Sequence, residues 1–258
     1  MAKNDPRQIL AQARRFAEDL SLFEGRHFIF PKESAVLASV SNTADSSGKE
    51  ALATEGENAP NSLAGESVVT FDQGEALDAF REEICKCTRC PLGANRNQFV
   101  FGSGNPDAGI MFVGEAPGAD EDRSGLPFVG AAGQLLTKII EAMGLLREEV
   151  YICNILKCRP PNNRDPQPEE IAQCEPYLKR QIELVQPRVL CTLGRFAAQT
   201  LLRSDLTMGR LRLSEHRYEG IPLVATYHPA ALLRNPQWKR PTWEDIKKVR
   251  RLYDGVAL

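Results

Sequence analysis

The sequence lacks the patterns that mark membrane and secreted proteins. No apolar run approaches the roughly 18–20 residues that a helix needs to cross a bilayer, and the opening residues, MAKNDP, contain no apolar region of the signal-peptide kind. A cytoplasmic protein is therefore expected. Because cytosolic thiols are normally kept reduced, the seven cysteines indicate metal ligands or core packing rather than disulfides.

Two nucleotide-binding fingerprints are also missing, and histidine is scarce. The glycine-rich stretch GEAPG at 114–118 is not GxGxxG, and it lacks the Gly-Lys-Ser/Thr of a P-loop. Only three histidines are available for chemistry. His228 directly follows an expected strand, whereas His27 and His216 have no comparable context.

Charge is divided unevenly along the 258 residues, although the formal net charge is only −2. Residues 1–83 hold 8 Lys/Arg against 15 Asp/Glu, a net −7, and residues 84–258 hold 24 against 19, a net +5. The basic C-terminal part is consistent with a polyanionic partner.

Composition divides the chain into three segments. Apolar residues at three- and four-residue steps predict an amphipathic helix in residues 1–30. Residues 31–72 are rich in Ser, Ala, Glu, Gly and Asn, which predicts a disordered acidic linker. Residues 73–258 are expected to form the folded domain. The tethered helix could dock on that domain or bind another protein as a helix in a groove.

Strands and helices are expected to alternate through the folded part. Short apolar runs predict strands at 109–113, 150–156, 189–193 and 223–227. Apolar periodicity predicts helices at about 74–84, 133–143, 168–185, 195–202 and 238–253, with an irregular or hairpin excursion at 209–221. This alternation predicts an α/β protein with one parallel sheet covered on both faces. The GEAPG loop then lies at the carboxyl end of a strand, where open α/β sheets bind ligands.

Four cysteines have the spacing of a metal site. Cys87 and Cys90 form a C-x-x-C pair, and Cys158 and Cys174 lie sixteen positions apart further along the chain. Four thiolates from two distant segments suit either zinc or a [4Fe–4S] cluster, and the alternative is buried, reduced cysteine. Cys153 and Cys191 lie inside expected strands and are predicted to belong to the core. Cys85 remains open, because it could compete with the other cysteines as a ligand.

Five ordered motifs resemble one enzyme family. They are GEAPG at 114–118, PFVGAAGQLL at 127–136, NILKCRPPNNR at 154–164, HPAALLR at 228–234 and the pattern C-x₂-C…C-x₁₅-C. Together they closely resemble the iron–sulfur (family 4) uracil-DNA glycosylases over about residues 76–250. The resemblance implies a three-layer α/β/α sandwich with a four-stranded parallel sheet.

The resemblance also implies an activity and a cofactor. A monofunctional glycosylase would flip uracil out of single- or double-stranded DNA, hydrolyse its N-glycosidic bond and leave an abasic site for base-excision repair. A structural [4Fe–4S] cluster would be held by Cys87, Cys90, Cys158 and Cys174, with Cys85 not a ligand. The protein is expected to be a monomer that acts on DNA in the cytoplasm, at the nucleoid in a prokaryote. Whether the N-terminal helix binds a protein partner is left open.

The same resemblance assigns roles in a uracil pocket. Phe128 is the candidate for stacking on the flipped base. Asn154 carries a carboxamide that accepts from N3–H and donates to O4, which separates uracil from cytosine. His228 is the candidate donor to uracil O2 as negative charge develops there. The backbone of Gly114, Glu115 and Ala116 is expected to complete the pocket.

The group that positions the attacking water is less clearly marked. The better-known branch of the superfamily has an aspartate in its first motif, where this chain has Ala116. Four carboxylates are candidates, with Glu115 favoured: Glu115, Asp120, Glu121 and Asp122.

Apolar and basic residues after His228 are candidates for DNA contact. An apolar tip at Leu232 and Leu233 would fill the vacated base stack while Arg234 meets a phosphate. Arg159 and Arg164 are further phosphate candidates, and the wider set adds Lys157, Lys239 and Arg240.

Two other kinds of protein remain open from the sequence. One is an iron–sulfur DNA-binding relative that does not turn over or that traps its product covalently. Trapping relatives carry an additional basic, His-containing loop after the first motif, and residues 122–126 contain no such insertion. The other is a zinc protein with four cysteine ligands.

Overall fold

Short apolar runs form the strands of one mixed sheet in the computed structural model, which describes residues 72–255. The strand order is β1-β3-β2-β4-β6-β5. The four inner strands are parallel: β2 (Ile110–Gly114), β3 (Tyr151–Asn154), β4 (Val189–Leu193) and β6 (Ile221–Thr226). The expected N-terminal helix and residues 31–71 of the expected linker lie outside the described residues.

The expected sheet of four parallel strands is present, and two short edge strands extend it to six. β1 (Ser103–Gly104) pairs with β3, and β5 (His216–Tyr218) pairs with β6, both antiparallel. Strands of two or three residues are too short to give an alternating pattern, so the sequence does not reveal them. β5 lies in the irregular or hairpin excursion expected at 209–221, and it forms a hairpin with β6, which corresponds to the strand expected at 223–227.

The helices connect these strands and flank the sheet. Their bounds are α2 (Gln73–Ile84), α3 (Leu92–Asn95), α4 (Ala119–Ser124), α5 (Ala131–Ala142), α6 (Pro168–Val185), α7 (Arg195–Leu202), α8 (Met208–Leu211), α9 (Pro229–Arg234) and α10 (Lys239–Tyr253). Three 3₁₀ turns complete the set: η1 (Arg147–Glu149), η2 (Pro161–Asn163) and η3 (Pro236–Trp238). The expected helices at 168–185 and 195–202 are confirmed to the residue.

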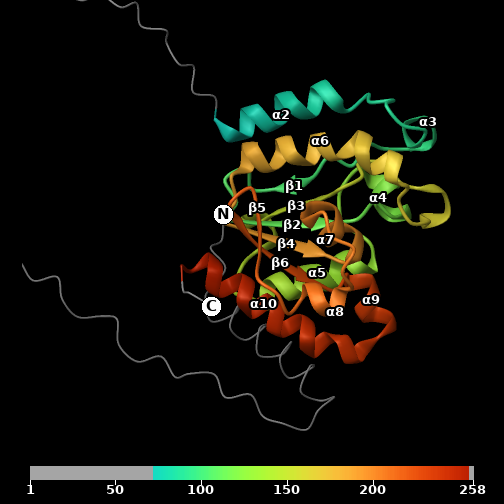
Figure 1. Cartoon of the computed structure of the whole chain (residues 1–258). Helices are drawn as coiled ribbons and strands as arrows, with labels where there is room; N and C mark the ends of the chain where they lie inside the picture. Colours follow the sequence, from blue (N-terminus) through green and yellow to red (C-terminus); the bar gives the residue numbers. More distant parts are fainter. Residues whose placement is uncertain (1–71, 256–258) are drawn as a thin grey trace, which may run out of the picture. The chain divides into compact units, whose positions relative to one another are not determined.

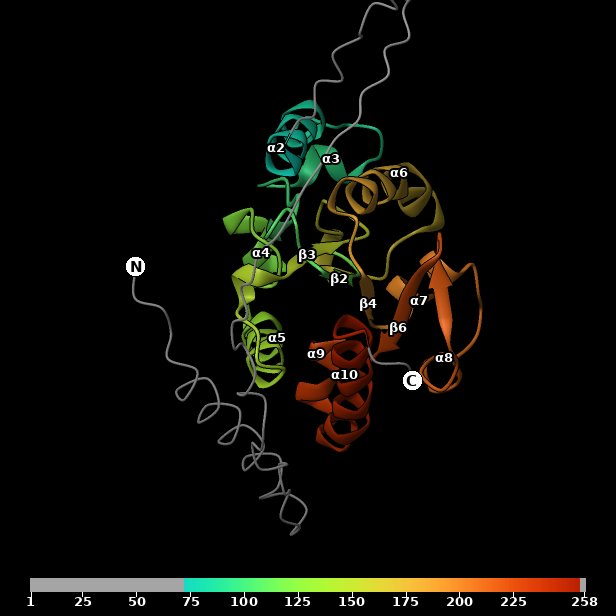
Figure 2. The ribbon, with the colours of Figure 1, turned by 90° about the vertical axis from the view of Figure 1, so that its left-hand side faces the viewer.

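Successive residues of each buried strand face opposite sides of the sheet, and so they pack against different helical layers. Met111 and Val113 face a core formed with α2, α6 and α7. Ile110 and Phe112 face a second core formed with α5, α9 and α10. Figures 1 and 2 show α2 and α6 on one side of the sheet and α9 and α10 on the other. The described residues therefore form the expected three-layer α/β/α sandwich.

The strand order locates a binding crevice. The chain leaves β2 for β3 on one side and then enters β4 on the other side of β2. Loops that follow β2 and β4 consequently diverge, and open α/β sheets bind ligands in the crevice between such loops.

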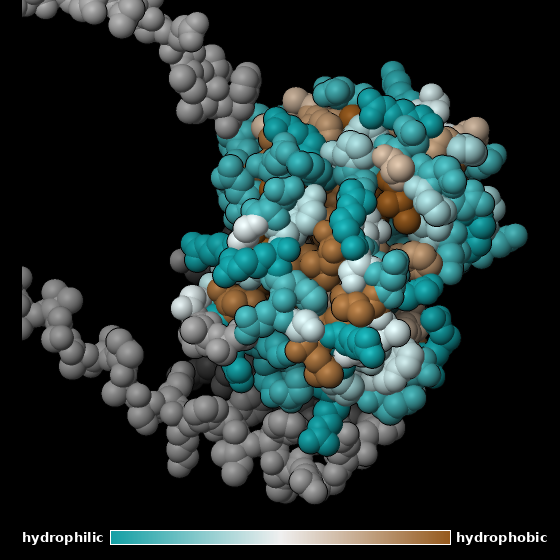
Figure 3. Space-filling view, viewed as in Figure 1, coloured by the Kyte–Doolittle hydropathy of each residue, from teal (hydrophilic) through white to brown (hydrophobic). Residues whose placement is uncertain are grey.

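The face shown in Figure 3 is largely hydrophilic, with several hydrophobic patches among the polar residues. The large hydrophobic side chains that are exposed are Leu126, Leu206, Leu213 and Leu233. Among residues 72–255, no helix combines the length and the apolar character needed to cross a membrane.

Candidate active site

A cavity of about 380 Å³ lies at the carboxyl ends of β2, β3 and β6. Its wall comes from the GEAPG loop after β2, the end of β3 and the loop after β6. The lining residues used below are Glu115, Glu121, Phe128, Asn154, Asp165, His228 and Arg234. The structure thus brings together the residues predicted to bind and stabilise a uracil base.

Asn154 ends β3 and has a side chain that is 1% exposed. Neither its Oδ1 nor its Nδ2 has a hydrogen-bond partner within residues 72–255. Leaving a buried polar atom without a partner costs about 1–3 kcal/mol. A buried amide that lines a cavity and has both atoms unpartnered is prepared to bind a molecule with one donor and one acceptor.

Gly114 allows this amide and an aromatic ring to meet. A Cβ atom on Gly114 would collide with Asn154 Oδ1 and would lie 2.5 Å from Phe128 Cζ. Any residue other than glycine at position 114 would therefore displace one of the two side chains.

Phe128 has an unusual backbone conformation, with φ at +52°. A bulky residue in this region is strained, at a cost of about 1–3 kcal/mol. Gly133 permits the arrangement, because a Cβ atom there would overlap the carbonyl group of Phe128. The Phe128 ring lies 5.5 Å from the His228 ring, at an interplanar angle of 31°. The sequence identified Phe128 as an aromatic candidate but gave no indication of its left-handed backbone.

His228 is the N-cap of α9, and this position determines its tautomer. Its Nδ1 accepts a hydrogen bond from the Ala230 N–H at 3.1 Å, so in the neutral ring the proton is on Nε2. The pKa of His228 is lowered to about 4, mainly by burial and also by the positive charge of Arg234, against an opposing effect of Glu121. At neutral pH the side chain is therefore an uncharged imidazole with an N–H to donate.

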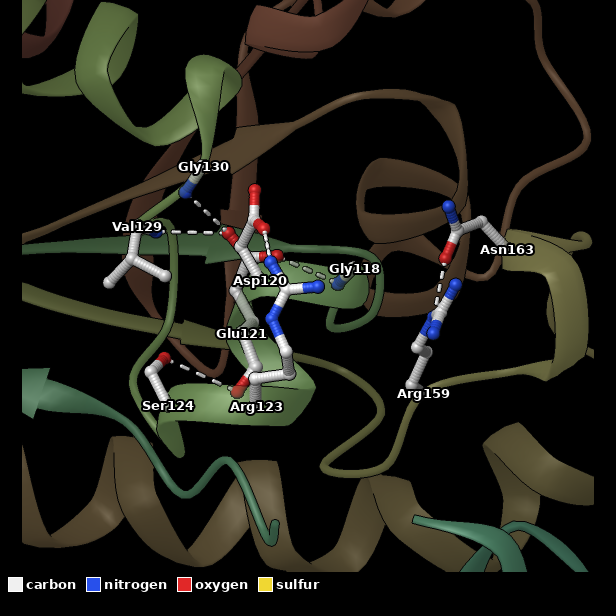
Figure 4. Close-up of polar contacts among 9 residues, drawn as sticks. All are labelled: Gly118, Asp120, Glu121, Arg123, Ser124, Val129, Gly130, Arg159 and Asn163. Carbon is white, nitrogen blue, oxygen red and sulfur yellow. Dashed lines mark hydrogen bonds and ion pairs between the residues drawn. The ribbon is translucent and has the colours of Figure 1, made fainter. Parts of the chain in front are cut away.

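Glu121 joins two loops at the cavity. One oxygen accepts from the Val129 N–H at 2.9 Å and the Gly130 N–H at 3.1 Å, and the other accepts from the Gly118 N–H at 3.0 Å (Figure 4). The carboxylate thereby fixes the GEAPG loop relative to the segment that carries Phe128. With its oxygens used in this way, Glu121 is a loop clamp.

Two further acidic candidates also have structural contacts. Asp120 pairs with Arg123 (Figure 4). Asp122 is buried and binds Asn97, accepting from the backbone N–H at 3.0 Å and from Nδ2 at 2.6 Å. Of the four carboxylates considered from the sequence, Glu115 is thus the one whose environment suits chemistry.

Glu115 lies in the cavity beside a second carboxylate that the sequence reasoning missed. The pKa of Glu115 is raised to about 7, mainly by burial and also by the negative charge of Asp165, against the lowering effect of Arg195. Asp165 lies on the wall of the same cavity, and its Oδ2 is 3.6 Å from Arg195 Nη2. The sequence offered one indication that Asp165 belongs to the site, namely its position one residue past the NILKCRPPNNR motif.

The prediction that Leu232 and Leu233 both form an exposed apolar tip is wrong for Leu232. Leu232 is 2% exposed and belongs to the core with α5 and α10, whereas Leu233 is 50% exposed. Consecutive residues of a helix point in different directions, so one of the pair was bound to face inward. Arg234 is exposed and lines the cavity.

The predicted phosphate contacts have differing surroundings. Arg164 Nη1 and Nη2 donate to the two oxygens of buried Glu170 at 2.9 and 2.5 Å, so its charge is already balanced. Arg159 is partly exposed, and its Nε donates to Asn163 Oδ1 at 2.8 Å (Figure 4). Lys157 is 0% exposed, which rules out the predicted surface phosphate contact.

The four predicted cluster cysteines lie in one electrostatic neighbourhood. Burial raises the pKa of Cys158, and nearby Cys90 and Cys87 raise it further against the lowering effect of Arg96. The pKa of Cys174 is likewise raised to about 12, mainly by burial and to a smaller extent by Cys158 and Cys90, against the lowering effect of Lys157. All are free thiols.

Hydrogen-bond donors surround these sulfurs, as they do around anionic sulfur centres. The Arg89 N–H lies 3.4 Å from Cys87 Sγ, and Tyr177 Oη lies 3.2 Å from the same sulfur. Arg96 Nη1 is 3.5 Å from Cys158 Sγ. Within residues 72–255, no three Cys, His, Asp or Glu side chains are arranged to hold a single metal ion. The donor set itself, four thiols with N–H, O–H and cationic neighbours, fits an iron–sulfur cluster.

The remaining cysteines differ from these four. Cys153 and Cys191 are 0% exposed within β3 and β4 and belong to the core, as expected. Cys85 donates to the Glu82 carbonyl at 3.3 Å.

Comparisons with known proteins agree with this geometry. Residues 101–247 match the family model of the uracil DNA glycosylase superfamily. The chain is 48% identical to the type-4 uracil-DNA glycosylase of Archaeoglobus fulgidus, over 69% of this chain and 94% of that protein. It is 46% identical to the Sulfurisphaera tokodaii enzyme of the same name, over 69% and 85%, and 42% identical to that of Thermotoga maritima, over 70% and 96%. The fold, the cavity and these relatives together show that the chain belongs to the uracil-DNA glycosylase superfamily, within its type-4 group.

Proposed function

We propose that this protein is a monofunctional uracil-DNA glycosylase that flips uracil out of DNA and hydrolyses its N-glycosidic bond. The observation that carries the proposal is the buried Asn154 amide, whose two polar atoms have no partner within residues 72–255. The product would be an abasic site, the starting point of base-excision repair.

Uracil has the groups that the amide needs. Its N3–H would donate to Oδ1 and its O4 would accept from Nδ2. Cytosine presents an acceptor at N3 and a donor at N4, so it would leave both atoms of Asn154 facing like groups. Discrimination of this kind is strong, because a mismatched base leaves buried polar groups unpaired.

The flipped base would lie against Phe128, whose ring is held in place by its strained backbone and by contact with His228. Stacking of a base on an aromatic ring contributes about 1–3 kcal/mol. This contribution offsets part of the few kcal/mol that flipping costs.

His228 would stabilise the leaving uracil. As the bond from N1 to the sugar breaks, negative charge spreads to O2, and the Nε2–H of the neutral imidazole is available to donate there. Removing a single preorganised donor of this type costs about 10²–10³-fold in rate.

Water is the proposed nucleophile, and Glu115 is the group proposed to position it. Glu115 and Asp165 form an acidic wall of the cavity, and a carboxylate near the anomeric carbon also favours a sugar with cationic character. Hydrolysis without a covalent intermediate on the protein is what makes the proposed enzyme monofunctional.

We propose that Cys87, Cys90, Cys158 and Cys174 hold a [4Fe–4S] cluster. The fit rests on four clustered thiols with nearby donors and on the surrounding Arg96 and Lys157. The bound cluster would supply structure, by linking the α2–α3 segment, the loop after β3 and α6. Absorbance near 400 nm together with four iron atoms per chain would support the assignment, and zinc in its place would contradict it.

Contact with DNA is assigned to the rim of the cavity. Leu233 would enter the gap left by the flipped base, Arg234 would contact a backbone phosphate, and Arg159 is a further candidate. We expect the protein to act as a monomer. Because its proposed substrate is DNA, it would work where the chromosome lies, at the nucleoid of a prokaryotic cell.

Residues 1–30 are proposed to recruit a protein partner. Deletion of residues 1–70 should then leave excision from a short oligonucleotide unchanged. A large loss would mean that these residues contribute to catalysis.

The test uses end-labelled single- and double-stranded oligonucleotides that each carry one uracil. Release of the base should make the strand cleavable by alkali at that position alone. His228→Ala should reduce the rate about 10²–10³-fold, while the matched control His216→Ala, on the edge strand β5, should not. If folded protein that contains its iron–sulfur cluster (loaded protein) does not release the base, the result would favour a DNA-binding relative without turnover. A protein–DNA adduct that survives denaturation would indicate covalent trapping.

A further inference from the structure

Lys157 has the least expected environment of any cation in the described residues. Its side chain is 0% exposed, although a lysine is almost never fully buried without a partner of opposite charge. Nζ donates to the Asn154 carbonyl at 2.6 Å and to Gln181 Oε1 at 2.5 Å, and both acceptors are neutral. Burying a cation with neutral acceptors alone is unfavourable, so negative charge is required nearby.

Two of the four predicted ligand cysteines, which together are called the cysteine centre below, lie beside Lys157 and can carry that charge. The backbone N–H of Lys157 lies 3.3 Å from Cys174 Sγ, the charge of Lys157 lowers the pKa of Cys174, and Cys158 is the next residue in the chain. As thiols these groups are neutral, and as ligands of a metal centre they are thiolates. A loaded centre therefore supplies the counter-charge for Lys157.

Helix α6 holds the lysine from two positions on one face. Cys174 and Gln181 are seven residues apart, which is close to two helical turns. Gln181 is itself 0% exposed, and its Nε2 donates to the Phe101 carbonyl at 2.9 Å and to Tyr151 Oη at 3.2 Å. The amide orientation is thus fixed, with its oxygen directed at Lys157.

The segment from 154 to 158 connects this cation to the pocket. The Ile155 N–H donates to the Gly114 carbonyl and the Leu156 N–H donates to the Glu115 carbonyl, each at 3.0 Å. The bond from Lys157 Nζ to the Asn154 carbonyl closes the segment on itself. The main chain that aims the Asn154 amide is therefore held on one side by the GEAPG loop and on the other by Lys157.

We propose that Lys157 is a positioning residue through which the cysteine centre keeps the uracil-reading Asn154 in place. The thiolates balance its buried charge, and its ammonium group fixes the Asn154 carbonyl. This inference rests on the proposed function, since it assigns a role in aiming the amide that would read uracil.

The test compares Lys157→Met with Lys179→Met, an exposed lysine on α6, in loaded protein. Lys157→Met keeps an unbranched side chain, one heavy atom shorter than lysine, and all four cysteines, so iron content should stay at the wild-type level. The single-turnover rate should fall about 10–100-fold through misplacement of the amide, with KM changed less than about twofold. Hydrogen exchange in peptides that cover 152–158 should become faster. The proposal would be overturned if the Lys157→Met protein had the same iron content, single-turnover rate and hydrogen-exchange rates as the Lys179→Met protein.

A second variant tests the charge balance if Lys157→Met does not fold. Gln181→Glu gives the ammonium a carboxylate partner inside the protein, so the lysine no longer depends on the thiolates. The difference in melting temperature between loaded and chelator-stripped protein should then be smaller than in the wild type. An unchanged or larger difference would refute the inference. These readouts do not require excision, whereas a wild-type protein that releases no uracil would refute the proposed function alone.

Discussion

Replacing Asn154 with leucine should make the protein more stable and less active. Leucine has nearly the shape of asparagine, with two methyl groups in place of Oδ1 and Nδ2, and the missing side chain at Gly114 leaves space beside it. What disappears are two buried polar atoms without partners, each of which costs about 1–3 kcal/mol in the free protein. We expect the free energy of unfolding to rise by about 1–3 kcal/mol after some loss from imperfect packing.

The assay is thermal unfolding at a fixed scan rate, with cluster loading matched by absorbance near 400 nm. For a domain of this size, each kcal/mol corresponds to a shift of about 2–4 °C. Excision should fall about 30-fold, because two hydrogen bonds to uracil of about 1 kcal/mol each are lost.

Asn97→Leu is the matched control. Asn97 Nδ2 donates to buried Asp122 Oδ2 at 2.6 Å, and the Asn97 backbone N–H donates to Oδ1. The substitution keeps the backbone bond but removes the side-chain donor from a buried carboxylate oxygen, so it should lower the melting temperature. If Asn97→Leu behaves in this way and Asn154→Leu also melts below the wild type, the amide of Asn154 has a partner in the free protein. The reasoning that links its burial to uracil would then be refuted.

Three other predictions test separate parts of the site and of its surroundings. The wild-type rate should rise with pH through about 7 as Glu115 ionises, and Asp165→Asn should move this rise to lower pH, because removing a negative neighbour lowers the pKa of Glu115; an unmoved pH profile would contradict the pairing. Glu121→Gln, which weakens hydrogen bonds to three backbone N–H groups, should slow excision at least about tenfold, and a wild-type rate would rule out the clamp. Leu233→Ala should slow excision from double-stranded but not single-stranded DNA, whereas Leu232→Ala should cost about 2–5 kcal/mol of stability; the reverse pattern would show that the outward-facing residue was misassigned.

Much of the fold could be predicted because the strands and long helices have strong patterns. β2 and β4 are continuous apolar runs, and α6 combines a clear apolar face with proline at its first position. The edge strands β1 and β5 could not be predicted, since two or three residues form no pattern.

The candidate site was predictable in its residue types and less so in its geometry. Asn154, Phe128 and His228 could be identified from motifs, and all three line one cavity. The orientation of Leu232 and Lys157 became known only from their burial in the structure, because the local sequence does not indicate that these side chains face inward. The spacing from Gly118 to Glu121 fits a helix N-cap with a glutamate three residues later, a pattern that would have indicated a structural role for Glu121.

The unpartnered amide of Asn154 also bears on the end of the catalytic cycle. The contacts proposed for Asn154, Phe128 and His228 all involve the base, and none involves the sugar or the phosphates. Free uracil therefore keeps every feature that this wall recognises after the bond to DNA has been cut. Departure of the base is then expected to be slow compared with that of a product recognised through its backbone, and added uracil should act as an inhibitor that competes with the flipped nucleotide.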